Sequence, residues 1–331
     1  MSRLNRIFAL ACAVAAFAAA PVSAAKPAAI LEAEIARLAI PAKGVVGVAA
    51  WRLDGKGKRV SVNADQPFPM ASTFKVAAAG ALLAKVDRGE FRLDRMVTID
   101  PDLHVESEVI ADRFIHPGVS LSVHNLLELM LTQSDNTATD VLTGLAGGPA
   151  AVTAWVRAQG VESLRLDRDT AGIVRDFFGL PPGPFPAALK AGLAADPDLE
   201  AKGSQLNPRF DDDTRDTSTP QAMASLLNRI FSGKALSPAS TTLLIESMER
   251  NRTGDARIRG RLPDGTTVAE KTGTIGGSLN DVGVISLPGD AGQIVVAVFI
   301  KKSEVPFEAR EEVIADIARS IYDYYLFESG R

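Results

Sequence analysis

Three short motifs in this 331-residue sequence carry side chains that could transfer an acyl group. Ser72 and Lys75 form an S-x-x-K motif at the start of an apolar stretch. Ser-Asp-Asn follows at 134–136, and Lys-Thr-Gly-Thr follows at 271–274. A hydroxyl nucleophile with a nearby base is what covalent catalysis at a carbonyl requires.

The S-x-x-K spacing predicts that Ser72 and Lys75 act together. Positions i and i+3 share one face of a helix, so the Nζ of Lys75 can reach the Oγ of Ser72. A serine hydroxyl is a weak nucleophile until a neighbouring base takes its proton. A lysine desolvated between two lobes has a lowered pKa, which suits that role. The same short pattern is also typical of a helix N-cap followed by an exposed lysine.

The other two motifs have structural alternatives as well. Residues 134–136 could cap the helix that follows them, and Lys271 could be a solvated lysine on an edge strand. The order S-x-x-K, S-D-N, K-T-G is, however, the set typical of class A β-lactamases and penicillin-binding proteins. The three motifs together therefore favour acyl-transfer chemistry over three separate structural roles.

Hydrophobic periodicity predicts an α/β (α+β) protein, with strand patterns at both ends of the chain and helical patterns between them. The expected helices cover 28–39, 122–133, 137–146, 149–159, 220–232, 237–250 and 307–327. The expected strands are VVGVAAWRL, KRVSVNA, TTVAEKT, DVGVISL and QIVVAVFIKK.

These elements are most simply assembled as two lobes. One lobe, about 28–70 and 260–331, is an antiparallel five-stranded sheet with the terminal helices packed on it. The other, about 71–259, is all-helical. The active site is expected between the lobes, where small-molecule sites usually lie.

The N-terminal 24 residues have the pattern of a cleaved secretory signal peptide. Arg3 and Arg6 precede a short apolar run, and small residues follow it; a retained membrane anchor is the alternative. The only cysteine, Cys12, lies in this segment, so the mature chain 25–331 can form no disulfide. The formal net charge is −4, and the sequence has no cluster of basic residues that would indicate nucleic-acid binding. The spacing of the three histidines matches no metal-binding motif.

Over nearly all of residues 28–327 the sequence resembles a class A serine β-lactamase. Beyond the three motifs, Arg165-Leu166-Asp167-Arg168 resembles the entry of that family's Ω loop, and RDTSTP at 215–220 resembles its exit. The resemblance implies the family's two-lobe fold. It also implies a salt bridge between Arg168 and Asp216 at the neck of an Ω loop that spans 168–216.

The resemblance implies a role for each motif residue. Ser72 is the implied acylated nucleophile, Lys75 its proton acceptor and Ser134 the relay to the departing lactam nitrogen. Asn136 is implied to bind the side-chain amide of the substrate. The backbone N–H groups of Ser72 and Thr274 are the implied oxyanion hole. The implied anion site for the substrate carboxylate consists of Arg257, Lys271, Thr272 and Thr274.

The glutamate that activates water in that family is absent from its usual position. In the family it follows the last arginine of the loop entry by two residues, and an asparagine follows four residues later; this chain has Thr170 and Val174 there. Counted back from the exit, Asn207 stands nine residues before Asp216 and matches the asparagine. This match implies an insertion of about 33 residues and puts the glutamate position at Gly203.

Our hypothesis is that Glu200 replaces this base. Asp169 is a second candidate, and turnover without any carboxylate base is the third possibility. The stretch 176–213, rich in proline and acidic residues, is expected to be a long loop of the functional or disordered kind.

The sequence therefore predicts a periplasmic β-lactam hydrolase that works through a Ser72 acyl-enzyme and confers β-lactam resistance. We expect a monomer that acts on a small-molecule β-lactam, with no cofactor, no metal, no nucleic acid and no stable membrane insertion after signal cleavage. The alternatives are a penicillin-binding peptidase or esterase-like serine hydrolase, and a β-lactam-binding protein that deacylates slowly. The missing glutamate keeps both alternatives open.

Overall fold

A five-stranded antiparallel sheet organises the computed structural model, which describes residues 27–107, 109–114 and 116–329. The predicted signal peptide, 1–24, lies outside the described residues. The strand order is β2-β1-β9-β8-β7, so the two N-terminal strands lie at one edge and join the three C-terminal strands where β1 pairs with β9. The strands are β1 (Val45–Arg52), β2 (Val60–Val62), β7 (Val268–Ile275), β8 (Ser278–Ser286) and β9 (Gln293–Lys301).

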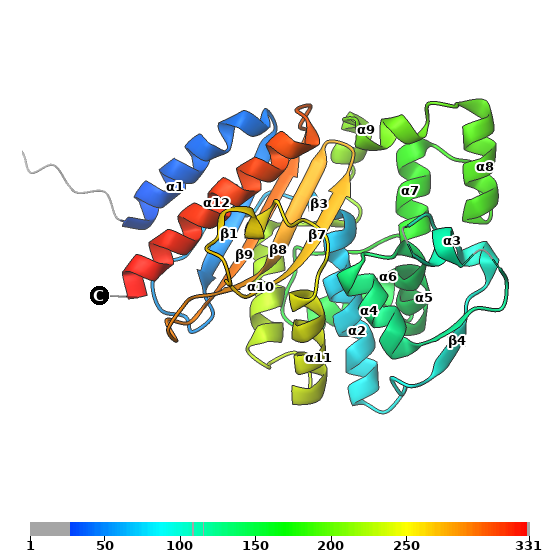
Figure 1. Ribbon diagram of the computed structural model, residues 1–331, viewed down its shortest axis with the longest axis horizontal. Coiled ribbons are helices and arrows are strands. Elements are labelled where there is room, and N and C mark those ends of the chain that lie inside the picture. Colours follow the sequence, from blue (N-terminus) through cyan, green and yellow to red (C-terminus); the bar gives the residue numbers. More distant parts are fainter. Residues whose placement is uncertain (1–26, 108, 115, 330–331) are drawn as a thin grey trace, which may run out of the picture.

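Helices cover both faces of this sheet (Figure 1). Helices α1 (Pro27–Leu38) and α12 (Phe307–Ser329) lie on one face, and α10 (Pro220–Phe231) packs on the other. Alternate residues of β9 belong to the two cores: Val295, Ala297 and Phe299 to one, and Val296, Val298 and Ile300 to the other. Burial on both faces explains why this strand is apolar at nearly every position.

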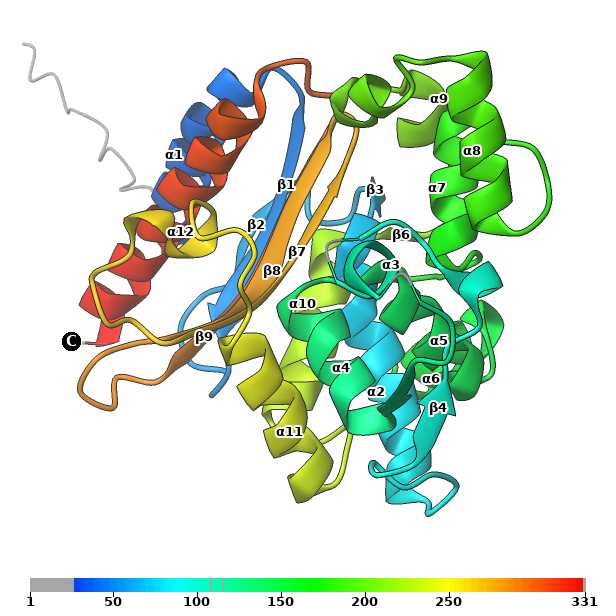
Figure 2. The same ribbon diagram turned by 45° about the vertical axis from the view of Figure 1, so that its right-hand side comes forward.

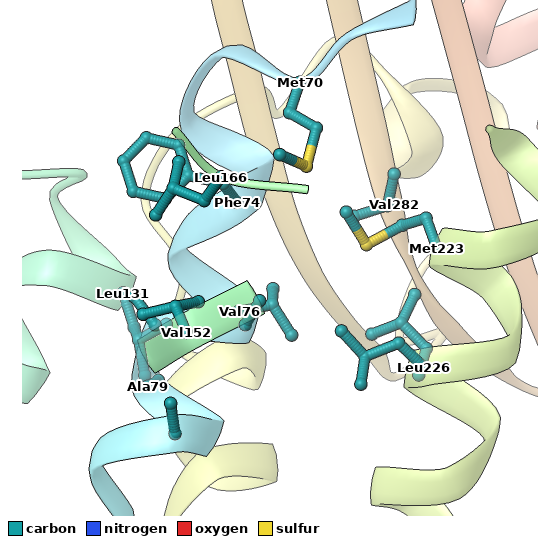
Figure 3. Close-up of a cluster of buried hydrophobic side chains, with 14 of the residues drawn as sticks. Met70, Phe74, Val76, Ala79, Leu131, Val152, Leu166, Met223, Leu226 and Val282 are labelled. Carbon is teal, nitrogen blue, oxygen red and sulfur yellow. The ribbon is translucent and has the colours of Figure 1, made fainter. Parts of the chain in front are cut away.

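The second lobe is helical and is built around α2 (Lys75–Asp87). This helix is apolar on nearly every side because other helices surround it. Figure 3 shows the cluster around it, to which Leu131, Val152 and Leu166 contribute from the helical lobe, Met223 and Leu226 from α10, and Val282 from β8. The neighbouring helices are α4 (Val123–Thr132), α5 (Asn136–Ala146), α6 (Pro149–Ala158) and α11 (Pro238–Glu249).

The remaining elements are short connections. Two two-stranded ladders pair β3 (Phe68–Pro69) with β6 (Thr217–Ser218), and β4 (Met96–Thr98) with β5 (Ser120–Ser122). The short helical segments are η1 (Ile40–Ala42), η2 (Ala71–Phe74), η3 (Pro101–Leu103), α3 (Ile110–Arg113), η4 (Glu200–Ser204), α9 (Pro208–Asp211) and η5 (Ile258–Arg261).

The stretch 176–213 is not the expected long loop, because it contains the end of α7 (Thr170–Phe178), all of α8 (Phe185–Ala195) and the short segments η4 and α9; that prediction is wrong. Helices α7 and α8 stand side by side at the outer edge of the helical lobe (Figure 2). The Asp169 carboxylate caps α7 by accepting the Gly172 N–H. The pair encloses a small core of its own, made by Val105, Leu180, Phe185, Ala188 and Leu199. This apolar burial outweighs the loop tendency of the proline and acidic residues.

The other predicted helices and strands are confirmed to within three residues at their ends. The lobe expected to be all-helical, about 71–259, also contains the short strands β4, β5 and β6, which were not predicted. Within the described residues, no helix has both the length and the apolar character that crossing a membrane requires.

Candidate active site

Ser72 lies where the two lobes meet, in η2 immediately before α2. Strand β7 approaches this turn so closely that a Cβ on Gly273 would stand 2.6 Å from the Met70 carbonyl oxygen and 3.1 Å from the Ser72 nitrogen. The buried Asn280 of β8 donates its Nδ2 to the carbonyl oxygens of Pro69 and Met70, at 2.9 and 3.0 Å. These contacts fix the backbone that precedes the serine against the sheet.

The Lys75 side chain is fully buried and makes three hydrogen bonds. Its Nζ donates to the Ser134 carbonyl oxygen at 2.7 Å, to the Ser134 Oγ at 3.2 Å and to the Asn136 Oδ1 at 2.8 Å. These three acceptors match the three donors of an ammonium group. Within the described residues no hydrogen bond joins this Nζ to the Ser72 Oγ, so the predicted direct contact is not formed in this state.

Ser134 receives a second lysine on the same hydroxyl. The buried Lys271 of β7 donates its Nζ to the Ser134 Oγ at 2.9 Å and to the Thr272 carbonyl oxygen at 3.0 Å. The Ser134 backbone has a φ of 58°, in the left-handed region that non-glycine residues rarely adopt. Strain of this kind persists where surrounding contacts fix it, and here it presents the hydroxyl to both lysines.

Burial controls the charge of both lysines. Desolvation lowers the pKa of Lys75 to about 7, although the carboxylates of Asp135 and Asp140 act in the opposite direction. Desolvation also lowers the pKa of Lys271 well below its usual range, and the charges of Lys75 and Arg257 add to this effect. A lysine with a pKa near neutrality can accept a proton under ordinary conditions, which an exposed lysine cannot do.

Three predicted anion-site residues, Lys271, Thr272 and Thr274, lie on β7, and Arg257 reaches this strand from the start of η5. Arg257 is buried and donates its Nη2 to the Thr274 Oγ1 at 2.8 Å, while its Nε bonds the Glu311 Oε1 at 3.0 Å. The Thr272 Oγ1 shares a 2.6 Å hydrogen bond with the Thr253 Oγ1. A guanidinium group next to the ammonium and hydroxyl groups of this strand can bind a carboxylate.

The neck of the inserted segment is closed as the resemblance implied. The Arg168 Nε bonds the Asp216 Oδ2 at 2.5 Å, and the Asp216 Oδ1 accepts the Asp167 and Arg168 N–H groups at 2.7 and 2.9 Å. The Asp216 carbonyl oxygen accepts the Met70 N–H at 3.0 Å. The neck is therefore connected directly to the turn that carries Ser72.

Thr170 occupies the first turn of α7, two residues beyond the neck arginine. Its backbone N–H donates to the Asp140 Oδ1 at 2.7 Å, and the Ala171 N–H donates to the Asp140 Oδ2 at 2.8 Å. Burial and the charge of Asp169 raise the pKa of Asp140 to about 6, against the effect of these N–H groups. Thr170 is buried, and its Oγ1 forms no hydrogen bond of normal geometry, although its hydroxyl interacts with the Asp140 carboxylate.

The residues predicted from the exit side of the loop are not brought to the lysines. The Asn207 side chain caps α9 by accepting the Phe210 N–H, and it donates to the Phe177 carbonyl oxygen at 3.1 Å. Glu200 is exposed on η4, and its charge acts on Glu106, whose pKa rises through burial and this repulsion. Within the described residues, no hydrogen bond joins Asn207 or Glu200 to Ser72, Lys75 or Ser134.

Sequence reasoning missed Asn280 and Asp140, which position the site. Asn280 fixes the turn before Ser72, as described above. The capping role suggested for residues 134–136 is confirmed for Asp135: it is buried, accepts the Ala138 and Ile110 N–H groups and the Ser107 hydroxyl, and so fixes the S-D-N turn. Asp140, one helical turn after Asn136, anchors the start of α7. For Asp140 the i, i+4 spacing from Asn136 was an available signal.

This arrangement suits acyl transfer to a serine. It combines a nucleophile, two buried lysines that meet at one hydroxyl, and a cationic strand beside them. Within the part of the chain that the structure describes, no group of three or more His, Cys, Asp or Glu side chains could hold a metal.

Comparisons with known proteins agree with this chemistry. A model of the beta-lactamase enzyme family matches residues 30–325. One similar solved structure is a mutant of the class A β-lactamase of the last common ancestor of Gram-negative bacteria. It is 37% identical in sequence, the match covers 89% of this chain and 98% of that chain, and the TM-score is 0.73. A β-lactamase from Chitinophaga pinensis is 29% identical, over 89% of this chain and 98% of its own, with a TM-score of 0.72.

Proposed function

The chain belongs to the beta-lactamase enzyme family and is a serine β-lactamase of class A, and we propose that it hydrolyses β-lactams through an acyl-enzyme on Ser72. The observation that carries this proposal is the Ser134 hydroxyl, which accepts hydrogen bonds from both Lys75 and Lys271 beside the serine. Such a hydroxyl can relay protons between the nucleophile and a leaving group.

Acylation begins when neutral Lys75 takes the Ser72 proton as the Oγ attacks the lactam carbonyl. The backbone N–H groups of Ser72 and Thr274 stabilise the resulting oxyanion, and each such donor contributes about 3 kcal/mol of barrier lowering. The proposal is supported by the close approach of β7 to the Ser72 turn at Gly273. Ser134 then delivers a proton to the lactam nitrogen as the ring opens.

Substrate binding uses two sides of the cleft. Lys271, Thr272 and Thr274, with Arg257 behind them, bind the substrate carboxylate. Asn136 binds the side-chain amide of the substrate with its Nδ2, which now donates to the Glu106 carbonyl oxygen at 2.7 Å. The Asn136 Oδ1 continues to accept the hydrogen bond from the Lys75 Nζ.

The inserted segment shapes the pocket for the acyl side chain. The Gly203 carbonyl oxygen accepts the Gly276 N–H at 2.9 Å, at the end of β7. A Cβ on Gly276 would stand 2.8 Å from both the Gln205 carbonyl oxygen and the Phe177 ring, so this contact is tight. We infer that the segment closes this end of the cleft and disfavours bulky acyl side chains.

The enzyme acts in the periplasm after removal of residues 1–24, as a monomer, and confers β-lactam resistance. These statements are supported by the signal-like sequence and by the family's chemistry. Expression with and without residues 1–24 in a susceptible Gram-negative host tests them. Resistance to penicillin is expected only with the segment present, and resistance without it would contradict periplasmic action.

A β-lactam-binding protein that deacylates slowly is the second candidate function. Thr170 at the usual glutamate position favours it, because a threonine cannot act as a general base near neutral pH. An intact-mass time course with penicillin distinguishes the two functions. Hydrolysis gives an adduct on Ser72 that decays as product accumulates, whereas the binding protein retains the adduct for hours.

A further inference from the structure

Turnover of the acyl-enzyme needs a group that activates water, and one carboxylate lies close to the lysine centre. Asn136 and Asp140 occupy the same face of α5, one turn apart. Asn136 holds the Lys75 Nζ at 2.8 Å, and the Asp140 charge acts on the same Nζ. Asp135 also acts on it, but the Asp135 carboxylate already accepts three hydrogen bonds.

Asp140 keeps capacity for a further hydrogen bond. Each of its oxygens accepts one backbone N–H, from Thr170 and from Ala171. A carboxylate has about four lone-pair sites, so besides these two N–H groups and the Thr170 hydroxyl it can accept from one water. The two N–H contacts fix the carboxylate in one orientation, which a general base needs.

A second polar atom lies next to Asp140. The buried Thr170 Oγ1 forms no hydrogen bond of normal geometry, but its hydroxyl interacts with the Asp140 carboxylate and acts to lower the pKa of that carboxyl, and the Thr170 backbone N–H bonds Asp140. A buried hydroxyl without a hydrogen bond is costly unless water satisfies it. A water between the Thr170 hydroxyl and the Asp140 carboxylate would satisfy both groups.

Water can reach Asp140 from the outer side of the helical lobe. A cavity of about 520 Å³ lies between α5, α7, α8 and η3, and its lining includes Asp140, Asp169, Asp102 and Arg175. Ser72, Lys75 and Ser134 are not among the residues that line this cavity.

We propose that Asp140 is the general base of deacylation and that the Thr170 hydroxyl holds the same water. This inference rests on the proposed function, since it concerns the second half of the same reaction. It replaces the hypotheses of Glu200 and Asp169, because Glu200 is exposed on η4 and the Asp169 carboxylate caps α7.

The step balances as an ordinary ester hydrolysis. Asp140 takes one proton from the water as the water oxygen bonds the acyl carbon. The tetrahedral intermediate then breaks its bond to the Ser72 Oγ. That oxygen regains a proton from Asp140 by way of Lys75, so the enzyme returns to its starting state.

The groups that face Asp140 define the expected pH profile. They are Lys75 from α2, Asp135 and Asn136 from α5, Asp169 and Thr170 from α7, and Asp102 and Arg175 across the cavity. Burial and Asp169 raise the pKa of Asp140 to about 6. The deacylation rate should therefore rise with pH through about 6, where the carboxylate loses its proton.

The test measures formation and decay of the Ser72 adduct separately, by intact mass, for penicillin G with the full chain. Asp140→Asn should slow decay by about 10²–10⁴-fold, the usual contribution of a general base, and abolish the rise through about pH 6. At a pH well above 7, where Lys75 is neutral in both proteins, formation should change by no more than about threefold. Thr170→Val, which keeps the backbone N–H, should slow decay by about tenfold, the effect of roughly one hydrogen bond.

Two matched variants separate catalysis from anchoring of α7. Asp169→Asn weakens the other carboxylate that caps this helix, and Glu200→Gln removes the rival loop acid; both should decay within about threefold of the parent. Parent-like decay in Asp140→Asn, or equal slowing in Asp169→Asn, would overturn the inference. If Asp140→Asn does not fold, Thr170→Val decides the question, and parent-like decay in that variant overturns it. An adduct that never forms on the parent protein refutes the proposed function instead.

Discussion

Two buried lysines converge on the Ser134 hydroxyl, and their separation into two roles depends on charge. Keeping both lysines protonated at once is energetically unfavourable, because desolvation lowers the pKa of each and their positive charges repel each other. Lys75 is balanced by Asp135 and Asp140, and its pKa is about 7. It is therefore the lysine whose proton exchanges near neutral pH.

The acylation rate should rise with pH through about 7. Below that pH Lys75 is charged and cannot accept the Ser72 proton; above it the neutral amine can. Stopped-flow measurement of adduct formation between about pH 5.5 and 8.5 checks this. Asp135→Asn removes a charge that raises the pKa of Lys75, so the midpoint should move to lower pH. A rate that is flat across this range would contradict a role for Lys75 as proton acceptor.

Gly273→Ala should abolish most acylation while the protein stays folded. The new Cβ would stand 2.6 Å from the Met70 carbonyl oxygen, so β7 must move away from the Ser72 turn. Such movement separates the two N–H donors, and loss of one donor costs about 10²–10³ in rate. Gly144→Ala is the control, because a Cβ there meets nothing within 4 Å. Parent-like acylation in Gly273→Ala would exclude the proposed oxyanion hole.

At the scale of elements, the neck of the inserted segment connects α7 to the Ser72 turn. Asp216 has a φ of 53° and bonds both the Arg168 side chain and two backbone N–H groups. Its carbonyl oxygen holds the Met70 N–H. A disturbance at the neck should therefore reach the nucleophile as well as the helix pair.

Asp216→Asn should lower the free energy of unfolding by about 1–3 kcal/mol, because it removes the charge of a buried, multiply bonded carboxylate. Urea denaturation measures the change. Asp212→Asn is the matched control, because Asp212 forms an exposed ion pair with Lys302 whose loss should cost less than about 1 kcal/mol. An equal loss of unfolding free energy in the two variants would show that the Asp216 contacts stabilise the fold no more than an exposed ion pair does.

The elements that could be predicted from the sequence are those with a strong apolar periodicity or a recognisable capping motif at the start of the helix. The five strands and the helices at both ends of the chain follow from apolar patterns, and the Ser134 turn follows from its motif. Helices α7 and α8 could not be predicted in this way, because their apolar positions pack on each other and on Val105 from a distant segment. The pairing of Asp140 with Thr170 was equally hidden, since it exists only when α5 and α7 are in contact.

At the scale of the whole molecule, the insertion extends the helical lobe and also reaches across to the sheet. Asp211 accepts the Ser278 hydroxyl at 2.9 Å and the Lys302 N–H at 3.1 Å, so the exit of the segment is tied to β8 and to the residue after β9. Together with the Gly203–Gly276 contact, these bonds join the two lobes at one end of the cleft.

Removal of residues 176–200 should change which acyl side chains are accepted. The deletion removes Phe177, whose ring lies against Gly276, and most of the small core of α7 and α8. The ratio of kcat/KM for a bulky penicillin to that for a small one should rise by about tenfold, the effect of a pocket that gains roughly one methylene or more of space. An unchanged ratio would mean that the segment does not line the acyl pocket.

The most direct test of an acyl-enzyme on Ser72 is an intact-mass time course of the purified protein with excess penicillin, with Ser72→Ala as the control. The account predicts an adduct of the full drug mass that forms on the parent protein, decays as hydrolysed drug accumulates, and never appears on Ser72→Ala. Absence of an adduct from the parent, or an equal adduct on Ser72→Ala, would contradict it.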